Sequence, residues 1–281
     1  MKKFIKNLIY IVKKIIKDGI TSLASEMAFN LMLAISPFII SLVAIFGLIS
    51  SYDLINDIIY FLSPIAPKDA LEVLKSALVG INLSSSGSIL TIGFLGTLWA
   101  VSNTTDIIIK GLNRAYQIKE SRPIWITKGL SLFIVLITVI VVFIAINLII
   151  FTPIVVNFIR NYIYIPHYLQ VLITLSKWPI TFFALFTVIL LIYSFMPNIK
   201  EKNKIRILNS LPGTLFFCIF WLVASWIFGL YTENYGKYNQ IYGALGAIII
   251  LLVWLYYTSL ILLIGGEINS IFYKTRINKE K

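Results

Sequence analysis

The sequence contains six long runs that hold no Asp, Glu, Lys or Arg. They are Met27–Tyr52, Ser76–Thr105, Gly129–Ile159, Trp178–Ile199, Ile207–Thr232 and Tyr238–Gly266. A helix needs roughly 20 apolar residues to cross about 30 Å of hydrocarbon, and each run is at least that long. Backbone amides in lipid must be satisfied within the segment, which favours helices. A membrane β-barrel would instead need alternating segments of about ten residues. We therefore predict six membrane-spanning helices.

The composition excludes most soluble classes of protein. Of the 281 residues, 59% are hydrophobic and 13% are charged, whereas soluble domains have about 45–50% and about 25%. Cys218 is the only cysteine, so neither an intramolecular disulfide nor a cysteine metal cluster can form. We predict an all-α integral membrane protein in which residues 1–281 form one membrane domain. The expected spans lie near residues 27–50, 88–109, 129–157, 169–196, 208–231 and 240–265.

The basic residues predict the orientation of these spans. Nineteen of the 24 Lys and Arg precede span one, lie between spans two and three or four and five, or follow span six. The alternate connections carry only five. Because cytoplasmic loops carry the excess of Lys and Arg, we expect both termini in the cytoplasm. The formal net charge of +12 is then mostly an orientation signal, and no nucleic-acid partner is needed to explain it.

Two segments outside the spans have amphipathic patterns. In residues 1–20, apolar residues recur at helical spacing and six lysines lie mostly opposite them. We predict an amphipathic helix on the inner leaflet, where anionic headgroups attract lysine, so membrane lipids are the first expected partner. In residues 52–88, apolar stripes on either side of Pro64 and Pro67 predict an external cap of two short helices.

Signatures of enzyme chemistry are scarce. The only histidine, His167, has no His or Cys at ligand spacing. The sequence has no phosphate-binding loop followed by Lys, no H-E-x-x-H and no G-x-S-x-G motif on a strand-to-helix turn. We expect no catalytic residue, metal or cofactor. Energy for any transport would come from an ion gradient, a concentration gradient or a partner.

Three acidic residues stand at span margins near the predicted cytoplasmic face, namely Glu26, Asp106 and Glu267. A carboxylate at the membrane centre costs about 2.5–3.5 kcal/mol on insertion scales, and the cost falls towards the margins. In one interpretation the three carboxylates stay hydrated or pair with Lys110, Arg114 or Lys274. In the other they converge on the mouth of a polar pathway.

Polar residues inside the first two spans suggest where such a pathway runs. Most uncharged polar groups in membrane helices bond to neighbouring helices, at about 0.6 kcal/mol per contact. Pro37, near the middle of span one, removes a backbone hydrogen bond, and the resulting kink can open a cavity. We predict a pathway lined by Asn30, Ser36, Pro37, Asn103 and Asp106. Glu26 and Glu267 would stand at its inner mouth as candidate proton or cation sites.

Glycines flank the last span. Gly243 and Gly246 are close to one helical turn apart at its start, and Gly265 and Gly266 stand at its end. Small residues let neighbouring backbones approach within a membrane. We predict that these four glycines serve helix packing.

Several motifs together resemble the YihY/BrkB family of bacterial inner-membrane proteins. They are S-L-A-S-E-M-A-F-N with S-P (22–37), L-W-A-V-S-N with L-N-R-A-Y (98–116), Y-x-x-x-P (193–197), L-P-G (211–213), Y-N-x-I-Y-G-A-L-G (238–246) and G-x-E-I-N (265–269). The resemblance covers about residues 21–272 and implies six membrane helices with both ends cytoplasmic. Family members have carried the label ribonuclease BN, a virulence label, and suggestions of lipid or solute transport. Metal-dependent RNA cleavage needs a cluster of His, Asp or Glu ligands, so we do not expect it here.

Two functions of different classes follow. The leading hypothesis is a permease or flippase-like transporter of a lipid, amphiphile or small solute, in the bacterial cytoplasmic membrane. The alternative is a non-transporting membrane scaffold or envelope regulator, which a bundle without a water-accessible cavity would favour. An intramembrane enzyme comes third and would require Ser, Asp or Glu side chains facing each other. The oligomeric state is left open.

Overall fold

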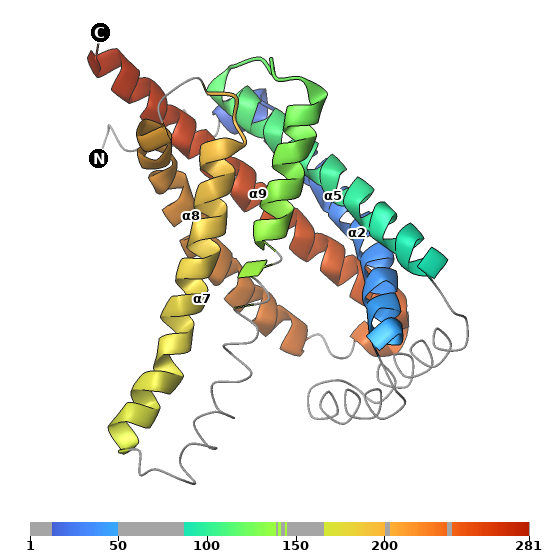
Figure 1. The fold of residues 1–281 in the computed structure, drawn as a ribbon. Helices are drawn as coiled ribbons and strands as arrows, with labels where there is room; N and C mark the ends of the chain where they lie inside the picture. The colour runs from blue at the N-terminus through green and yellow to red at the C-terminus, as the bar shows by residue number, and fades with distance from the viewer. Residues whose placement is uncertain are drawn as a thin grey trace. The chain divides into compact units, whose positions relative to one another are not determined.

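The computed structural model describes residues 13–49, 87–138, 140, 141, 144, 166–199, 203–234 and 238–280. Within these ranges every regular element is a helix, which confirms the all-α class for this part. The long helices are α2 (Ile20–Ile49), α5 (Gly87–Tyr116), α7 (His167–Phe195), α8 (Asn203–Asn234) and α9 (Tyr238–Glu280) (Figure 1). The predicted cap at 52–88 and most of the predicted interfacial helix at 1–20 lie outside the described residues.

Three described helical segments are long and apolar enough to cross a membrane. They are Thr91–Tyr116, Ile207–Leu230 and Ile248–Arg276, with shorter apolar helices at Ile124–Thr138 and Phe182–Phe195. The three long segments fall on predicted spans two, five and six, and the two shorter helices fall on spans three and four. A membrane protein with several apolar helices is therefore established, and the number six stays a prediction.

The helices extend beyond the apolar runs. α5 continues through Lys110 and Arg114 to Tyr116, and α9 passes Glu267 before it ends at Glu280. Lys, Arg and Glu are good helix formers, so the backbone need not end where the apolar composition ends. The predicted limits at 109 and 265 marked the change of composition and not the helix ends.

The chain divides into two compact units. The first comprises Met1–Ala28 with Thr105–Lys281, and the second comprises Phe29–Thr104. In the first unit α8 packs against both α7 and α9, and α7 and α8 run antiparallel (Figure 1). In the second unit α2 and α5 approach closely, because a Cβ atom on Gly96 would lie 3.0 Å from Cβ of Pro37.

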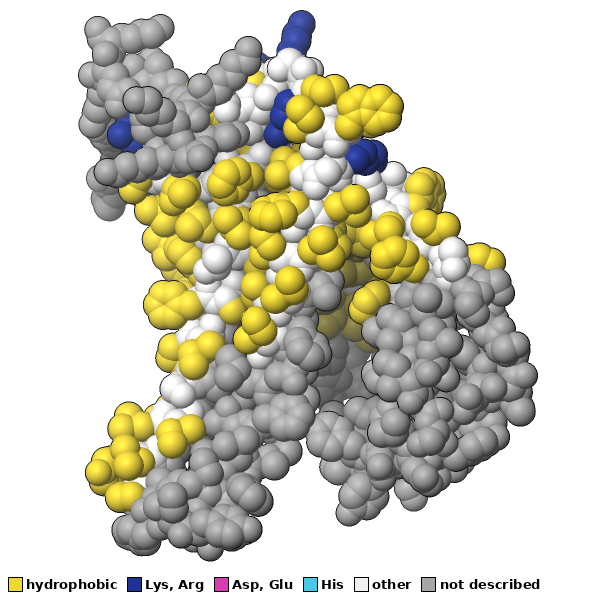
Figure 2. All heavy atoms as spheres, viewed as in Figure 1, with side chains coloured by type: hydrophobic (Ala, Val, Ile, Leu, Met, Phe, Trp, Pro, Cys, Tyr) yellow, Lys and Arg dark blue, Asp and Glu magenta, His cyan; other side chains and the backbone are white. Residues whose placement is uncertain are grey.

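The first unit has an apolar outer surface and buried polar groups. On α8 the residues Leu215, Ile219, Leu222 and Trp226 are 47%, 54%, 47% and 67% exposed, and their spacing puts them on one helical face. Figure 2 shows hydrophobic side chains spread over the face that includes α7, with Lys and Arg towards one end. The side chains at most 1% exposed include Ser210, Thr214, Ser259, Glu267, Asn269 and Ser270. Soluble proteins rarely expose such apolar area, whereas lipid solvates it and disfavours unpaired polar groups.

A close junction joins α7, α8 and α9. Tyr193 donates its hydroxyl hydrogen to the carbonyl oxygen of Leu262 at 2.6 Å, and Gly213 N donates to Asn269 Oδ1 at 2.6 Å. A Cβ atom on Gly213 would overlap the carbonyl oxygen of Gly265 and the Asn269 amide, and one on Gly265 would overlap the Tyr193 hydroxyl. The absence of side chains at these two glycines therefore allows the three helices to reach hydrogen-bonding distance.

We predict that Gly213→Ala destabilises the bundle and that Gly229→Ala, in the same helix, does not. A Cβ atom on Gly229 meets nothing within 4 Å. Overpacking typically costs about 1–3 kcal/mol, so the free energy of unfolding in detergent micelles should fall by about that amount for Gly213→Ala only. Equal free energies of unfolding for the two variants would show that the helices can move apart at this junction without loss of stability.

Candidate functional site

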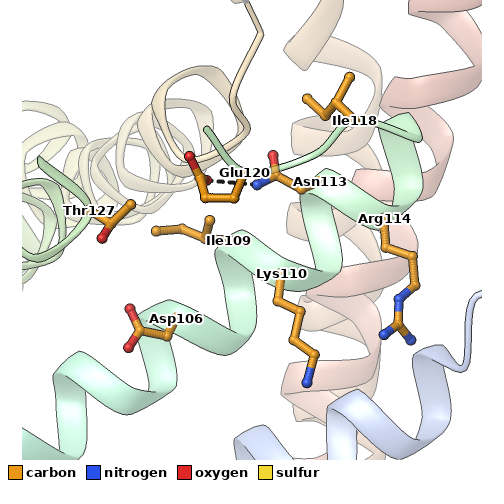
Figure 3. A pocket seen from close by; sticks show the side chains of 8 residues that line it. All are labelled: Asp106, Ile109, Lys110, Asn113, Arg114, Ile118, Glu120 and Thr127. Carbon is orange, nitrogen blue, oxygen red and sulfur yellow. Dashed lines mark hydrogen bonds between the residues drawn. The ribbon is translucent and has the colours of Figure 1, made fainter. Parts of the chain in front are cut away.

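A charged cavity of about 440 Å³ lies beside the C-terminal half of α5 (Figure 3). It is lined by Asp106, Ile109, Lys110, Asn113, Arg114, Ile118, Glu120 and Thr127. Four of these eight residues are ionisable. Because ionisable groups in membrane segments are costly, they usually face a bundle interior or a water-filled cavity, and they mark candidate functional sites.

The cavity arises from one face of α5 and the chain reversal that follows it. Lining residues 106, 109, 110, 113 and 114 recur at helical spacing, so they share a face. After Tyr116, Gln117 has a φ of 58°, and Ile118 N donates to the Asn113 carbonyl oxygen at 2.9 Å. This left-handed helix end, a Schellman motif, turns the chain back along α5. Glu120 and Thr127 are thereby brought to the cavity.

Ion pairs at the cavity are accessible to solvent. Lys128 Nζ donates to Asp106 Oδ2 at 2.5 Å, and Lys110 Nζ lies 3.9 Å from Glu26 Oε2. The four side chains are between about two-fifths and half exposed. Exposed ion pairs contribute only about 0–1 kcal/mol to stability. Asp106 and Lys110 can therefore exchange these partners for a charged ligand at small energetic cost.

Hydrogen bonds of Glu120 and Arg122 stabilise the chain reversal that follows α5. Arg122 donates to both carboxylate oxygens of Glu120, at 2.9 and 2.7 Å, and to the carbonyl oxygen of Met196 at 2.6 Å. Asn113 Nδ2 donates to Glu120 at 2.8 Å, and Asn113 Oδ1 accepts from Asn198 N at 2.8 Å. The Arg122 hydrogen bond is the main cause that lowers the pKa of Glu120 from 4.5 to about 2. The bonds tie the end of α5 to the end of α7.

A second ionic cluster is buried against α9. Lys14 is 5% exposed and Glu267 is fully buried. Lys14 Nζ donates to Glu267 Oε2, to Ser270 Oγ at 2.7 Å and to the carbonyl oxygen of Ala115 at 2.7 Å. Asp18 Oδ2 lies 3.9 Å from the same nitrogen. One ammonium group thus joins residues 13–18, called the N-terminal segment below, to the end of α5 and to α9.

A glycine turn positions Lys14. The helical residues before Asp18 end there, Asp18 N donates to the Lys14 carbonyl oxygen at 2.8 Å, and Gly19 has a φ of 63°. Glycine adopts this conformation without steric cost, and α2 begins at the next residue. The predicted interfacial helix placed its lysines at lipid headgroups. In the described part Lys13 and Lys17 are exposed, but Lys14 enters the protein.

The residues of the predicted polar pathway are divided between the two units. Asn30, Ser36, Pro37 and Asn103 belong to the second unit, and Asp106 belongs to the first. Within the second unit Ser36 is exposed and the other three are partly buried. The convergence of these residues on one pathway stays a prediction.

Each of the three acidic residues at the span margins has a cationic partner. The pairs are Glu26 with Lys110, Asp106 with Lys128, and Glu267 with Lys14. Lys110 was among the predicted partners, whereas Lys128 and Lys14 were not. Asp106 and the Glu26–Lys110 pair lie at the cavity, and Glu267 lies in the buried cluster.

Four glycines of the last span were predicted to serve helix packing, and the structure describes the surroundings of some of them. Cβ atoms on Gly265 and Gly266 would overlap Tyr193 and Leu112, respectively. Gly246 is buried. The surroundings of Gly243 lie outside the described side chains.

Several site residues were not predicted from the sequence: Lys14, Asp18, Asn113, Glu120, Arg122 and Lys128. A local signal existed for one pair, because Glu120 and Arg122 are two residues apart after a helix end. The other partners are distant in sequence and follow from the fold.

The long apolar helices define a helical integral membrane protein. Ionisable side chains line a cavity beside α5. The family described as Virulence factor BrkB matches residues 11–281, and the chain belongs to this family. The resemblance to the YihY/BrkB family is thereby confirmed over nearly the whole sequence.

Individual relatives carry little functional information. The chain is 25% identical over 255 residues to the ribonuclease-like protein YfkH of Bacillus subtilis strain 168, covering 91% of this chain and 90% of YfkH. It is 38% identical over 85 residues to UPF0761 membrane proteins of Xanthomonas campestris pv. campestris strain B100 and Xanthomonas axonopodis pv. citri strain 306. Those matches cover 30% of this chain and 19% of either relative. No solved structure matches the chain.

We predict that Lys14→Met is strongly destabilising, because it leaves Glu267 and Asp18 buried without their ammonium partner. Removing one member of a buried ion pair typically costs about 3–5 kcal/mol. Lys13→Met, at the adjacent exposed position, is the matched control and should change stability by no more than about 0.5 kcal/mol. The free energy of unfolding in micelles checks this, and similar values for both variants would refute the structural role of Lys14.

We predict that the stabilising effect of Glu120 depends on pH. Its folded pKa of about 2 lies below the ordinary 4.5, so the ionised carboxylate stabilises the folded state above pH 4.5, and this contribution is lost as the pH falls towards 2. The wild type should melt at a higher temperature than Glu120→Gln at neutral pH, with a difference that narrows below pH 4.5. A difference that stays constant across this window would contradict the assignment.

Proposed function

We propose that this protein is a permease or flippase-like transporter of a lipid, amphiphile or small solute. It would act in the bacterial cytoplasmic membrane with both termini in the cytoplasm, as the distribution of Lys and Arg favours. The observation that carries the proposal is the charged cavity beside α5, in a chain whose outer surface is apolar.

The cavity favours transport over a purely structural role. A scaffold can bury an apolar bundle completely and has no need of ionisable groups on a membrane span. Here Asp106 and Lys110 lie on the span Thr91–Tyr116 and are half exposed at a cavity. Ionisable residues in such positions commonly mark the paths of substrates or ions.

The charges of the cavity suggest a cargo that carries both signs. On the face of α5 that lines the cavity, Lys110 and Arg114 extend in one direction and Asp106 extends in another (Figure 3). A phosphate group could bind between Lys and Arg through charge-assisted hydrogen bonds, and an ammonium group could bind Asp106. A phospholipid with an amino-alcohol headgroup has both groups within one small headgroup and is the cargo we test first.

Nuclease chemistry is not part of this proposal. The word ribonuclease-like belongs to the name of YfkH, and metal-dependent RNA cleavage needs several clustered ligands. The chain has one histidine. In the described residues no group of three or more His, Cys, Asp or Glu side chains could hold a metal. We propose a non-enzymatic protein without a nucleic-acid partner.

We predict that the full-length protein, reconstituted in liposomes, moves fluorescently labelled phosphatidylethanolamine between leaflets. Lys110→Gln and Asp106→Asn should each lower the rate about tenfold or more, because a hydrogen bond to a charged group contributes about 1.5–3 kcal/mol. Lys119→Gln, an exposed change that does not line the cavity, is the matched control and should keep the wild-type rate.

Protein-free vesicles set the background, and ion flux is measured in parallel. Wild-type rates in both cavity variants would exclude the cavity from the path. Neither lipid movement nor ion flux in the wild type would overturn the proposal and favour the scaffold.

A further inference from the structure

We propose that Asp18 and Glu267 form a carboxyl pair that binds one proton, held in place by Lys14. The proton would then be the ion to which the proposed transporter couples. This coupling role rests on the proposed function. The proton site itself stands on the contacts around the two carboxyl groups.

The two carboxyl groups come from different parts of the chain and meet in a buried place. Asp18 ends the N-terminal segment and is 6% exposed, and Glu267 belongs to α9 and is fully buried. Each carboxylate lies beside the same Lys14 nitrogen, so the two groups are neighbours. Both face the same ammonium group, which bonds to Glu267 and lies 3.9 Å from Asp18.

The hydrogen-bond donors around the pair are fully used. Lys14 has three ammonium hydrogens, and these go to Glu267 Oε2, Ser270 Oγ and the carbonyl oxygen of Ala115. Ser270 gives its one hydroxyl hydrogen to the Glu267 carbonyl oxygen at 2.8 Å. Asp18 Oδ2 and Glu267 Oε1 are therefore buried acceptors that no described side chain or backbone group donates to.

A proton shared by the two carboxyl groups satisfies both acceptors. Two ionised carboxylates cannot hydrogen-bond to each other, and like charges in one buried site disfavour the second charge. When one carboxyl is protonated it donates to the other, and the remaining carboxylate balances Lys14. The proton then lies between the two carboxyl groups and is shared by them.

Three further cations lie near the pair, and none of them donates to its free oxygens, Asp18 Oδ2 and Glu267 Oε1. Arg114 Nη1 donates to the backbone carbonyl oxygen of Asp18 at 2.8 Å, and Lys274 donates to Gln117 at 2.6 Å. Lys17 is exposed. They add positive potential at the rim of the site but provide no hydrogen bond to the two free carboxylate oxygens.

The proton site adjoins the charged cavity through consecutive residues of α5. Arg114 lines the cavity and bonds to the backbone of Asp18, and Ala115 accepts a hydrogen bond from Lys14. Uptake or loss of the proton changes the charge that holds Lys14 in place. It thereby changes how firmly the N-terminal segment is attached beside the cavity.

The test is infrared spectroscopy of the full-length protein in detergent micelles at neutral pH, which detects the carbonyl stretch of a protonated carboxyl group. We expect one such band from a buried group in the wild type and its loss in both Asp18→Asn and Glu267→Gln. Each amide can donate a hydrogen bond in place of the proton, so both variants should fold. Glu26→Gln, which removes an exposed carboxylate outside the pair, is the control and should retain the band.

The absence of the band from the folded wild type, or its presence in both amide variants, would overturn the proton site. If one amide variant fails to fold, the spectra of the other variant and of the wild type still test the proton site.

Lipid movement in vesicles separates the two proposals. A band without transport overturns the proposed function and supports the proton site, whereas transport without the band overturns the proton site alone. If the protein shows the band but its transport rate does not change with an imposed pH gradient, the coupling role is overturned.

Discussion

Hydrocarbon offers no hydrogen-bond partners, so polar groups inside this bundle must find partners within the chain. That constraint accounts for the closest contacts in the first unit. The Tyr193 hydroxyl donates to a carbonyl oxygen of α9, and Asn269 accepts from the backbone of α8 at Gly213. Lys14 uses all three of its hydrogens on different acceptors. Each contact joins separate helices, so polar satisfaction and helix packing are achieved by the same atoms.

The apolar framework could be predicted from the sequence because composition responds directly to the solvent. Runs without charge identified the helices that now appear as α5, α8 and α9, and no long-range information was needed. Helix ends were less predictable. The composition changes where lipid gives way to water, whereas α9 continues past Glu267 and α5 continues to a left-handed residue at Gln117. A glutamine in that position carries no clear signal, since glycine usually occupies it.

The site was predictable only in part, and the reason is the distance between its components. The cost of a carboxylate in a membrane segment indicated that Glu267 needed a partner, but one lysine among six in an amphipathic pattern looks interfacial. Which lysine is buried depends on the turn at Gly19, which redirects the chain just after Lys14. Glu120 and Arg122 are the opposite case, since their pairing is local.

The cavity and the buried cluster are connected by contacts of consecutive residues of α5. Arg114 cannot turn fully into the cavity without releasing the backbone of Asp18, and Ala115 holds Lys14 from the next position along α5. A ligand that recruits Arg114 therefore competes with a hydrogen bond that attaches the N-terminal segment. By thermodynamic reciprocity, a change that loosens this segment must alter ligand affinity by the same factor. A negatively charged group in the cavity would weaken the attachment of residues 14–18, whereas the proposed shared proton links Asp18 to Glu267 and would strengthen it, so binding of each should disfavour binding of the other.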